Sequence, residues 1–160
     1  MRNRKKRSWL AFLIVSVIIL NVFAYLMPKR LSRVEIWATM LFALLLAYIV
    51  DTYLDRKYHL YGYFTQNIDW LSVIPIFGLY PAVSTIFLNY YPLNKNVSWK
   101  TLYIAGWTVF SLLFEYASIV SGYFHHSGWK LLYSALCYPV LLYILVWDLK
   151  FIRKLESGQQ

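Results

Sequence analysis

Cysteine, charge and recognisable catalytic motifs are all scarce in this chain. Its 160 residues contain one cysteine, Cys137, so an internal disulfide bond is excluded. Cys137 has no CxxC partner and lies within an apolar run, which indicates a small core residue rather than a redox centre. Only 14% of the residues are charged, against about 25% in an average soluble domain. The composition therefore points away from a soluble globular protein.

Signatures of catalysis and of cofactor binding are missing as well. The sequence contains no GxSxG, HExxH, P-loop or dinucleotide-binding fingerprint. It has no repeat of fixed period, and its only biased segments are the basic N-terminus and the polar tail "ESGQQ". We therefore expect no cofactor and no bound metal, and the motifs favour a non-enzymatic protein.

Long apolar runs take the place of these features. The chain is 60% hydrophobic and 20% aromatic, with a mean hydropathy of +0.49. Five runs are each close to the roughly 20 residues that a helix needs to cross a bilayer core. Short links join them, and most tryptophans fall near run ends, as expected at membrane interfaces. We predict an all-α fold, a polytopic transmembrane helical bundle forming a single domain over residues 1–160, with spans at about 8–27, 34–54, 70–91, 101–124 and 129–152.

The basic residues bear on partners and on orientation. The formal net charge is +9, but the Lys and Arg residues form short clusters between apolar runs. Such clusters are typical of contact with anionic lipid headgroups rather than with nucleic acid. Five of them lie in the tail of residues 1–7, "MRNRKKR", which predicts a cytoplasmic N-terminus. The first run is too long for an ordinary signal peptide and lacks a convincing cleavage site, so we expect it to remain as an anchor.

The third run leaves an alternative open, with four spans plus a re-entrant segment. It contains Pro75, Gly78 and Pro81, which break or kink helices, and irregular backbone at depth is tolerated where protein buries it. Five full spans place eight Lys and Arg on each side, whereas a re-entrant third run places twelve inside and four outside, which fits the charge rule better. We favour five spans because the run is long enough, and the side of the C-terminus depends on this choice.

Glu115 is the one carboxylate in the middle of an apolar run, in "SLLFEYASIVSGYF". A charge at the centre of a span costs about 2.5 to 3.5 kcal/mol on insertion scales, so the side chain should face protein or water. Small and hydroxyl residues recur around it at helical spacing and form one polar stripe with it: Thr101, Thr108, Ser111, Ser118, Gly122 and His125. Glu115 is then either a staple bonded to neighbouring hydroxyls or to Asn21, or part of a polar cavity that relays protons or cations.

Two further groups of polar residues are weaker candidates. Asp51 and Asp55 stand four apart in "DTYLDRKYHLYGYF" and share a helix face, which predicts a charged cap at the membrane interface. Metal binding with His59 is disfavoured, because the spacing is not a ligand signature and two basic residues lie beside the carboxylates. In "HHSGW", His125 begins the pair that ends the fourth run, and adjacent histidines point in different directions on a helix. The aromatic residues after Asp55 suggest a segment lying on the headgroup surface.

At these same residues the chain resembles a family of small multi-spanning membrane proteins of spore-forming Firmicutes. The similarity rests on "DTYLDRKYHLYGYF", "NYYP" and "FEYASIVSGYFHHSGW", which together span most of the chain from Asp51 onward. The resemblance implies multi-pass insertion in a bacterial inner membrane, the cytoplasmic membrane. The family has no assigned activity, so the resemblance implies no catalytic residues.

Three hypotheses of function follow. The favoured one is a non-enzymatic integral membrane protein, an accessory or assembly subunit or a sensor, which acts through helix contacts in the bilayer with a membrane protein partner or in a homo-oligomer. The second is a small transporter or channel with a polar path around Glu115. The third is a membrane-embedded enzyme acting on a lipid or isoprenoid, which requires Glu115 to meet Asp or His side chains in an open cavity.

Overall fold

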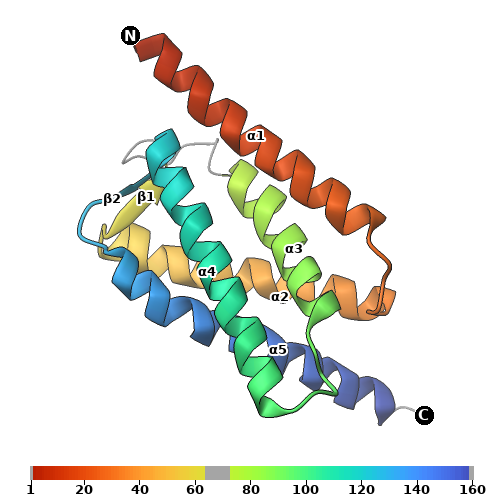
Figure 1. Cartoon of the computed structure of the whole chain (residues 1–160). Coiled ribbons are helices and arrows are strands. Elements are labelled where there is room, and N and C mark those ends of the chain that lie inside the picture. Colours follow the sequence, from red (N-terminus) through yellow and green to blue (C-terminus); the bar gives the residue numbers. More distant parts are fainter. Residues whose placement is uncertain (1, 64–72, 159–160) are drawn as a thin grey trace.

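The chain forms a bundle of five long helices (Figure 1). At one end lies a short antiparallel sheet of two strands from separate parts of the chain, which we call the hairpin. The computed structural model describes the backbone of residues 2–63 and 73–158, without the side chains of residues 2–8, 55, 56 and 63. The elements in chain order are α1 (Arg2–Leu26), α2 (Arg33–Asp51), the π-helix η1 (Thr52–Lys57), β1 (Tyr61–Tyr63), α3 (Val73–Tyr90), α4 (Val97–Ser121), β2 (Phe124–His126) and α5 (Leu131–Ser157).

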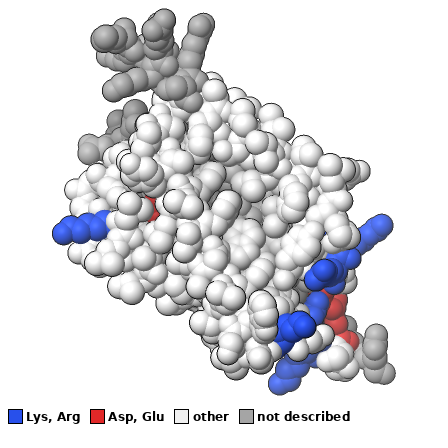
Figure 2. Space-filling view, in the orientation of Figure 1, with Lys and Arg blue, Asp and Glu red and all other residues white. Residues whose placement is uncertain are grey.

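Every one of the five helices is long and apolar enough to cross a membrane. Their outer faces carry large apolar side chains that no other part of the described chain covers, such as Ile19, Leu41, Leu113 and Leu136. Figure 2 shows a face of the molecule that is uncharged over most of its area, with most of the visible Lys and Arg at the end where α5 finishes. An apolar belt bordered by cations is the surface expected of a bundle surrounded by lipid. The predicted transmembrane helical bundle with five spans is therefore confirmed.

The described part of the third apolar run forms one continuous helix, Val73–Tyr90, so the four-span alternative is not supported. Pro81 lies inside α3, where it removes the hydrogen bond that the Phe77 carbonyl would otherwise accept. The helix nevertheless runs from the hairpin end of the bundle to the connection between α1 and α2 (Figure 1). There the Asn89 side chain donates to the Pro28 carbonyl at 3.0 Å and accepts from the Arg30 amide at 2.7 Å. Its neighbours thus hold α3 in place despite the proline.

Helix ends follow local capping chemistry. Ser32 caps α2 in a capping box, in which its hydroxyl accepts from the Glu35 amide and the Glu35 carboxylate accepts from the Ser32 amide. The same carboxylate pairs with Arg153 of α5. Asn96 caps α4, and α4 ends at Gly122, whose φ of 90° is left-handed. Because only glycine adopts this conformation freely, it sets the end of α4 before the two histidines, which the sequence had placed on the helix.

The hairpin joins two connections that are far apart in the sequence. In its antiparallel register Tyr61 pairs with His126 and Gly62 pairs with His125. The carbonyl of Leu60 accepts from three consecutive backbone amides, those of residues 127–129, at 2.9 to 3.0 Å. These bonds tie the α2–α3 connection to the α4–α5 connection, so the hairpin covers one end of the bundle. The sequence analysis did not predict any strand there and expected a segment on the headgroup surface.

Candidate functional site

Glu115 is buried in the bundle and accepts hydrogen bonds from three side chains. Only 6% of its surface is exposed. Its Oε1 lies 2.8 Å from Nε2 of His126 and accepts from the Ser134 hydroxyl at 2.8 Å, and its Oε2 accepts from the Tyr138 hydroxyl at 2.5 Å. Ser134 and Tyr138 stand four residues apart on α5, so both point from one face of that helix. The carboxylate therefore joins α4 to α5 and to the hairpin.

Trp129 extends this network outward. Its indole N–H donates to the Ser134 hydroxyl at 2.7 Å, and Ser134 donates in turn to Glu115. The Ser134 oxygen thus accepts one bond and donates another, which fixes its orientation. The edge of the Trp129 ring also contacts Tyr61 of β1, with ring centroids 5.9 Å apart. Residues from the hairpin region therefore surround the carboxylate on the side facing the end of the bundle.

A second carboxylate, Asp51, lies where α2 passes into the π-helix. Its Oδ1 accepts from the Tyr61 hydroxyl at 2.7 Å, and the side chain is buried rather than exposed at an interface as the sequence suggested. π-helical segments occur often at functional sites, because the extra residue per turn redirects side chains. Here the segment precedes the turn that returns Tyr61 toward Asp51. The side chain of Asp55, the other interface candidate, lies outside what the structure describes.

A cavity of about 200 Å³, which we call the carboxylate chamber, lies between α2, α3, α4 and α5. Asp51 and Glu115 both line it, together with five aromatic residues: Tyr61, Tyr80, Phe124, Trp129 and Tyr138. Most of the remaining lining is aliphatic, apart from three serines and Cys137, and none of the described lining residues is Lys or Arg. The chamber is therefore apolar over most of its wall and carries two carboxylates, one of which contacts His126, with no Lys or Arg among its described lining residues.

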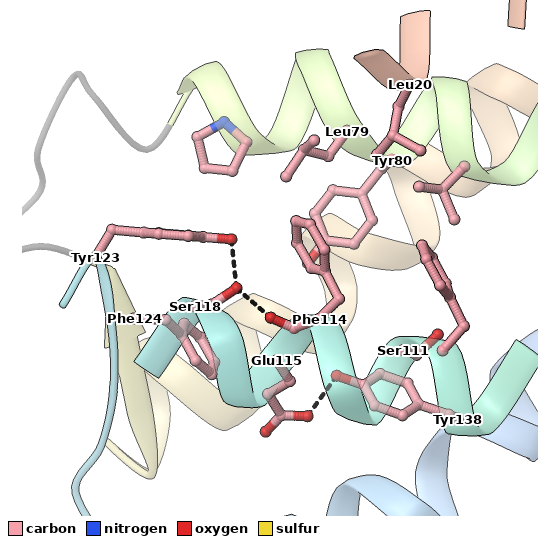
Figure 3. Close-up of a pocket in the computed structure, with 13 residues that line it drawn as sticks. Leu20, Leu79, Tyr80, Ser111, Phe114, Glu115, Ser118, Tyr123, Phe124 and Tyr138 are labelled. Carbon is pink, nitrogen blue, oxygen red and sulfur yellow. Dashed lines mark hydrogen bonds between the residues drawn. The ribbon is translucent and has the colours of Figure 1, made fainter. Parts of the chain in front are cut away.

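A second cavity of about 160 Å³, the apolar chamber, lies beside the first and extends toward α1 (Figure 3). Leu20, Leu79, Phe110 and Phe114 contribute to its wall. Six residues line both chambers and form the partition between them: Tyr80, Val83, Ser111, Glu115, Phe124 and Tyr138. Figure 3 shows the Tyr138 hydroxyl directed at the Glu115 carboxylate, so this hydrogen bond belongs to the partition.

The end of the bundle opposite the hairpin is densely packed. Phe87, Leu88 and Leu149 are almost fully buried in one apolar cluster, against which Tyr103 and Trp107 pack. Ala43, Leu142 and Leu145 belong both to this cluster and to the wall of the carboxylate chamber. The cluster therefore closes the chamber on that side, and the chamber lies in the half of the bundle nearer the hairpin.

The other predicted polar residues lie in different surroundings. Asn21 donates to the carbonyls of Val17 and Gly78, so it joins α1 to α3 instead of reaching Glu115. Thr108 is buried and donates to the Ile104 carbonyl of its own helix. Ser111 lines both chambers.

Ser118 lies at the wall of the apolar chamber. Its hydroxyl is hydrogen-bonded to that of Tyr123 at 2.7 Å, across the turn that ends α4. Burial raises the pKa of the Tyr123 phenol above its ordinary value, and the hydrogen bond from Ser118 opposes this shift.

Four residues that contact the two carboxylates were not predicted from the sequence: Tyr61, His126, Ser134 and Tyr138. The histidine was assigned to the wrong member of the pair, because alternation along a strand turns His125 away and His126 toward Glu115. Ser134 and Tyr138 have the four-residue spacing of a helix face, which was a readable signal on the fifth run. In the described part of the chain no three His, Cys, Asp or Glu side chains gather as a metal site.

Comparisons with known proteins gave no relative: no family model, curated protein or solved structure matches this chain. The class of protein is thus defined by its own fold and cavities, as a five-span helical membrane bundle with a buried carboxylate site.

Proposed function

We propose that the protein is a non-enzymatic membrane sensor that binds a small hydrophobic cation in the carboxylate chamber. The proposal rests on the composition of the chamber wall, in which Asp51 and Glu115 are accompanied by aromatic and aliphatic side chains and by no described Lys or Arg. A carboxylate inside a membrane bundle marks a functional site by default. A chamber that offers negative charge within an apolar wall favours a positively charged, otherwise apolar ligand.

The aromatic rings support the same class of ligand. Tyr and Trp rings attract an ammonium group through their negative faces. The cation–π interaction energy is about 2 kcal/mol or more when the pair is desolvated. The size of the chamber limits the ligand, since a cavity of about 150 Å³ holds benzene and this one measures about 200 Å³. An organic ammonium of roughly eight non-hydrogen atoms is therefore the expected occupant.

The geometry favours a sensor over the transporter hypothesis. A transport path must reach both ends of the bundle, whereas the cluster around Phe87 and Leu149 fills the end opposite the hairpin. The enzyme hypothesis remains the second candidate, because Glu115 contacts His126 and lines one chamber with Asp51. A sensor is favoured by the way the hairpin contacts the site through Tyr61 and His126. A ligand that takes these carboxylates would displace both contacts and so change the end of the bundle, which a partner protein or second copy can detect.

The membrane and the orientation are part of the proposal. The resemblance to the Firmicute family supports a bacterial cytoplasmic membrane. Five Lys and Arg residues in residues 1–7 support a cytoplasmic N-terminus, which would place the hairpin on the cytoplasmic side. That orientation places the end where α5 finishes, which carries most of the Lys and Arg visible in Figure 2, on the opposite side of the membrane.

The test uses Cys137, which lines the carboxylate chamber and is the sole cysteine of the chain. The purified protein in nanodiscs is treated with N-ethylmaleimide, and the rate of Cys137 alkylation is measured with increasing hexylammonium or with hexanol. Hexylammonium should slow alkylation at least tenfold more effectively than hexanol, because the two differ only in the charged group. Equal protection by the two compounds would refute the cationic site.

Two variants locate the effect. Glu115→Gln keeps an oxygen for Ser134, and its amide can donate to the Tyr138 oxygen, so it should fold while losing most protection by hexylammonium. Asp148→Asn is the matched control, because Asp148 is a buried carboxylate on α5 that lines neither chamber. Loss of protection in Asp148→Asn as large as that in Glu115→Gln would mean that the chamber is not the binding site.

A further inference from the structure

We propose that the ligand is a single-chain alkylammonium amphiphile, which holds its head in the carboxylate chamber and its chain in the apolar chamber. This inference rests on the proposed function and names the class of ligand. It starts from the observation that the two chambers share six residues, including Glu115 and Tyr138. Only the thickness of these side chains separates the two volumes.

The two chambers differ in the chemistry of their walls. The carboxylate chamber contains Asp51 as well as Glu115, and the indole of Trp129. The apolar chamber has Glu115 only at the partition, and elsewhere Leu20, Leu79 and phenylalanine rings form much of its wall. A charged head is therefore better stabilised in the first, and a hydrocarbon chain is better stabilised in the second. No single small ion uses both kinds of wall, whereas an amphiphile does.

The apolar chamber also lies on the lipid side of the bundle. Leu20 belongs to α1, most of whose described apolar side chains are exposed; its neighbour Ile19 has 60% of its surface exposed. An amphiphile dissolved in the bilayer has its chain at this depth already, so it can enter between α1, α3 and α4 without crossing water.

Binding of the head would itself open the partition. The Tyr138 hydroxyl donates to Oε2 of Glu115, which is the oxygen that a ligand ammonium would take. An ammonium donates to the carboxylate more strongly than a neutral phenol does, since both partners are charged. Tyr80 and Tyr138 each directly precede a proline within a helix, Pro81 in α3 and Pro139 in α5. Each proline removes one backbone hydrogen bond nearby, so the helix yields there at lower cost than in an unbroken segment.

The experiment is a chain-length series in the Cys137 protection assay, from hexylammonium to tetradecylammonium. In the native protein, the concentration of ammonium compound that halves the rate of Cys137 alkylation should fall about fourfold per added methylene. The affinity should keep rising until the ligand has roughly fourteen non-hydrogen atoms. This is about the number that the two chambers hold together, if a cavity of about 150 Å³ holds one benzene molecule. A gain that ends at roughly eight atoms in the native protein would overturn the two-chamber site.

The decisive variant is Leu20→Trp, which fills the apolar chamber from its lipid side. It should bind hexylammonium as the native protein does and gain nothing from longer chains. Ile19→Trp is the matched control, since the neighbouring side chain faces lipid and should leave the series unchanged. Long chains partition into the bilayer equally for all three proteins, so the comparison at one chain length removes that effect. An unchanged series in Leu20→Trp refutes the inference.

Leu79→Phe narrows the same chamber from α3 and replaces Leu20→Trp if the latter does not fold. Its outcome is read in the same way. Absence of protection by hexylammonium in the native protein is a different result, because it refutes the proposed function itself and not only the second chamber.

Discussion

Replacing Tyr138 by phenylalanine removes one hydroxyl and leaves the ring in place. That hydroxyl donates to Oε2 of Glu115 at 2.5 Å. Side-chain hydrogen bonds between membrane helices are worth about 0.6 kcal/mol on average in double-mutant cycles, with a maximum of about 1.7. A charged acceptor roughly doubles the strength of such a bond. We therefore expect a coupling free energy of about 1.2 kcal/mol between Tyr138 and Glu115, roughly an eightfold change in the unfolding equilibrium constant.

The assay is a double-mutant cycle of the native protein, Tyr138→Phe, Glu115→Leu and the double variant, because leucine, unlike glutamine, offers the Tyr138 hydroxyl no hydrogen-bond partner. The free energy of unfolding is measured by titrating sodium dodecyl sulfate into mixed micelles and following helicity by circular dichroism. Tyr143→Phe is the control, since this tyrosine lies on the same helix with 60% of its surface exposed. A surface change of that kind should stay within about 0.5 kcal/mol. A coupling below about 0.3 kcal/mol would show that the bond does not hold the partition.

Three other predictions concern residues around the site. Ser134→Ala removes the acceptor of the Trp129 indole and one donor to Glu115, and should cost about 1 to 3 kcal/mol in the same titration, with a shift in tryptophan emission; an unchanged emission would contradict this. Gly122→Ala should cost about 1 kcal/mol because φ is +90°, although an added Cβ meets no atom within 4 Å, and Gly122→Asn, which tolerates that backbone, should recover part of the loss. Burial raises the pKa of Tyr123 above 10.0 in the folded protein. The protonated phenol therefore contributes to the free energy of unfolding below about pH 10, and this contribution is lost as the pH rises through the pKa of the folded state. The free energy of unfolding measured against pH should show this loss, and Tyr123→Phe should reduce it.

The carboxylate could be found from the sequence, but its partners could not. A charge in an apolar run is costly wherever the helix packs, so composition alone identifies Glu115. The donors come from α5 and the hairpin, and helical periodicity within one run says nothing about which other run faces it. The sequence left open whether hydroxyls or Asn21 would bond Glu115; the structure has the hydroxyls of Ser134 and Tyr138, whereas Asn21 joins α1 to α3.

The number of spans could be read because it depends on local properties, namely length and apolar composition. The third run was ambiguous because proline disfavours a helix and because the count of Lys and Arg fits the four-span alternative better. The contacts of Asn89 and the neighbouring helices outweigh the effect of proline. The hairpin could not be foreseen, since its two strands have three residues each and come from separate connections. The position of the Gly122 cap decides which histidine faces the site. A single glycine in an apolar run does not show where the helix ends, so the sequence could not indicate which histidine this would be.

All three donors to Glu115 come after it in the chain, at His126, Ser134 and Tyr138. During synthesis, α4 therefore reaches the membrane before any residue that satisfies its carboxylate has left the ribosome. Until these residues follow, a charge at the centre of α4 costs about 2.5 to 3.5 kcal/mol on insertion scales, so we expect α5 to assist the stable insertion of α4. A chain that stops before α5 would leave the carboxylate without these donors, and quality-control proteases would meet α4 as an incompletely inserted helix.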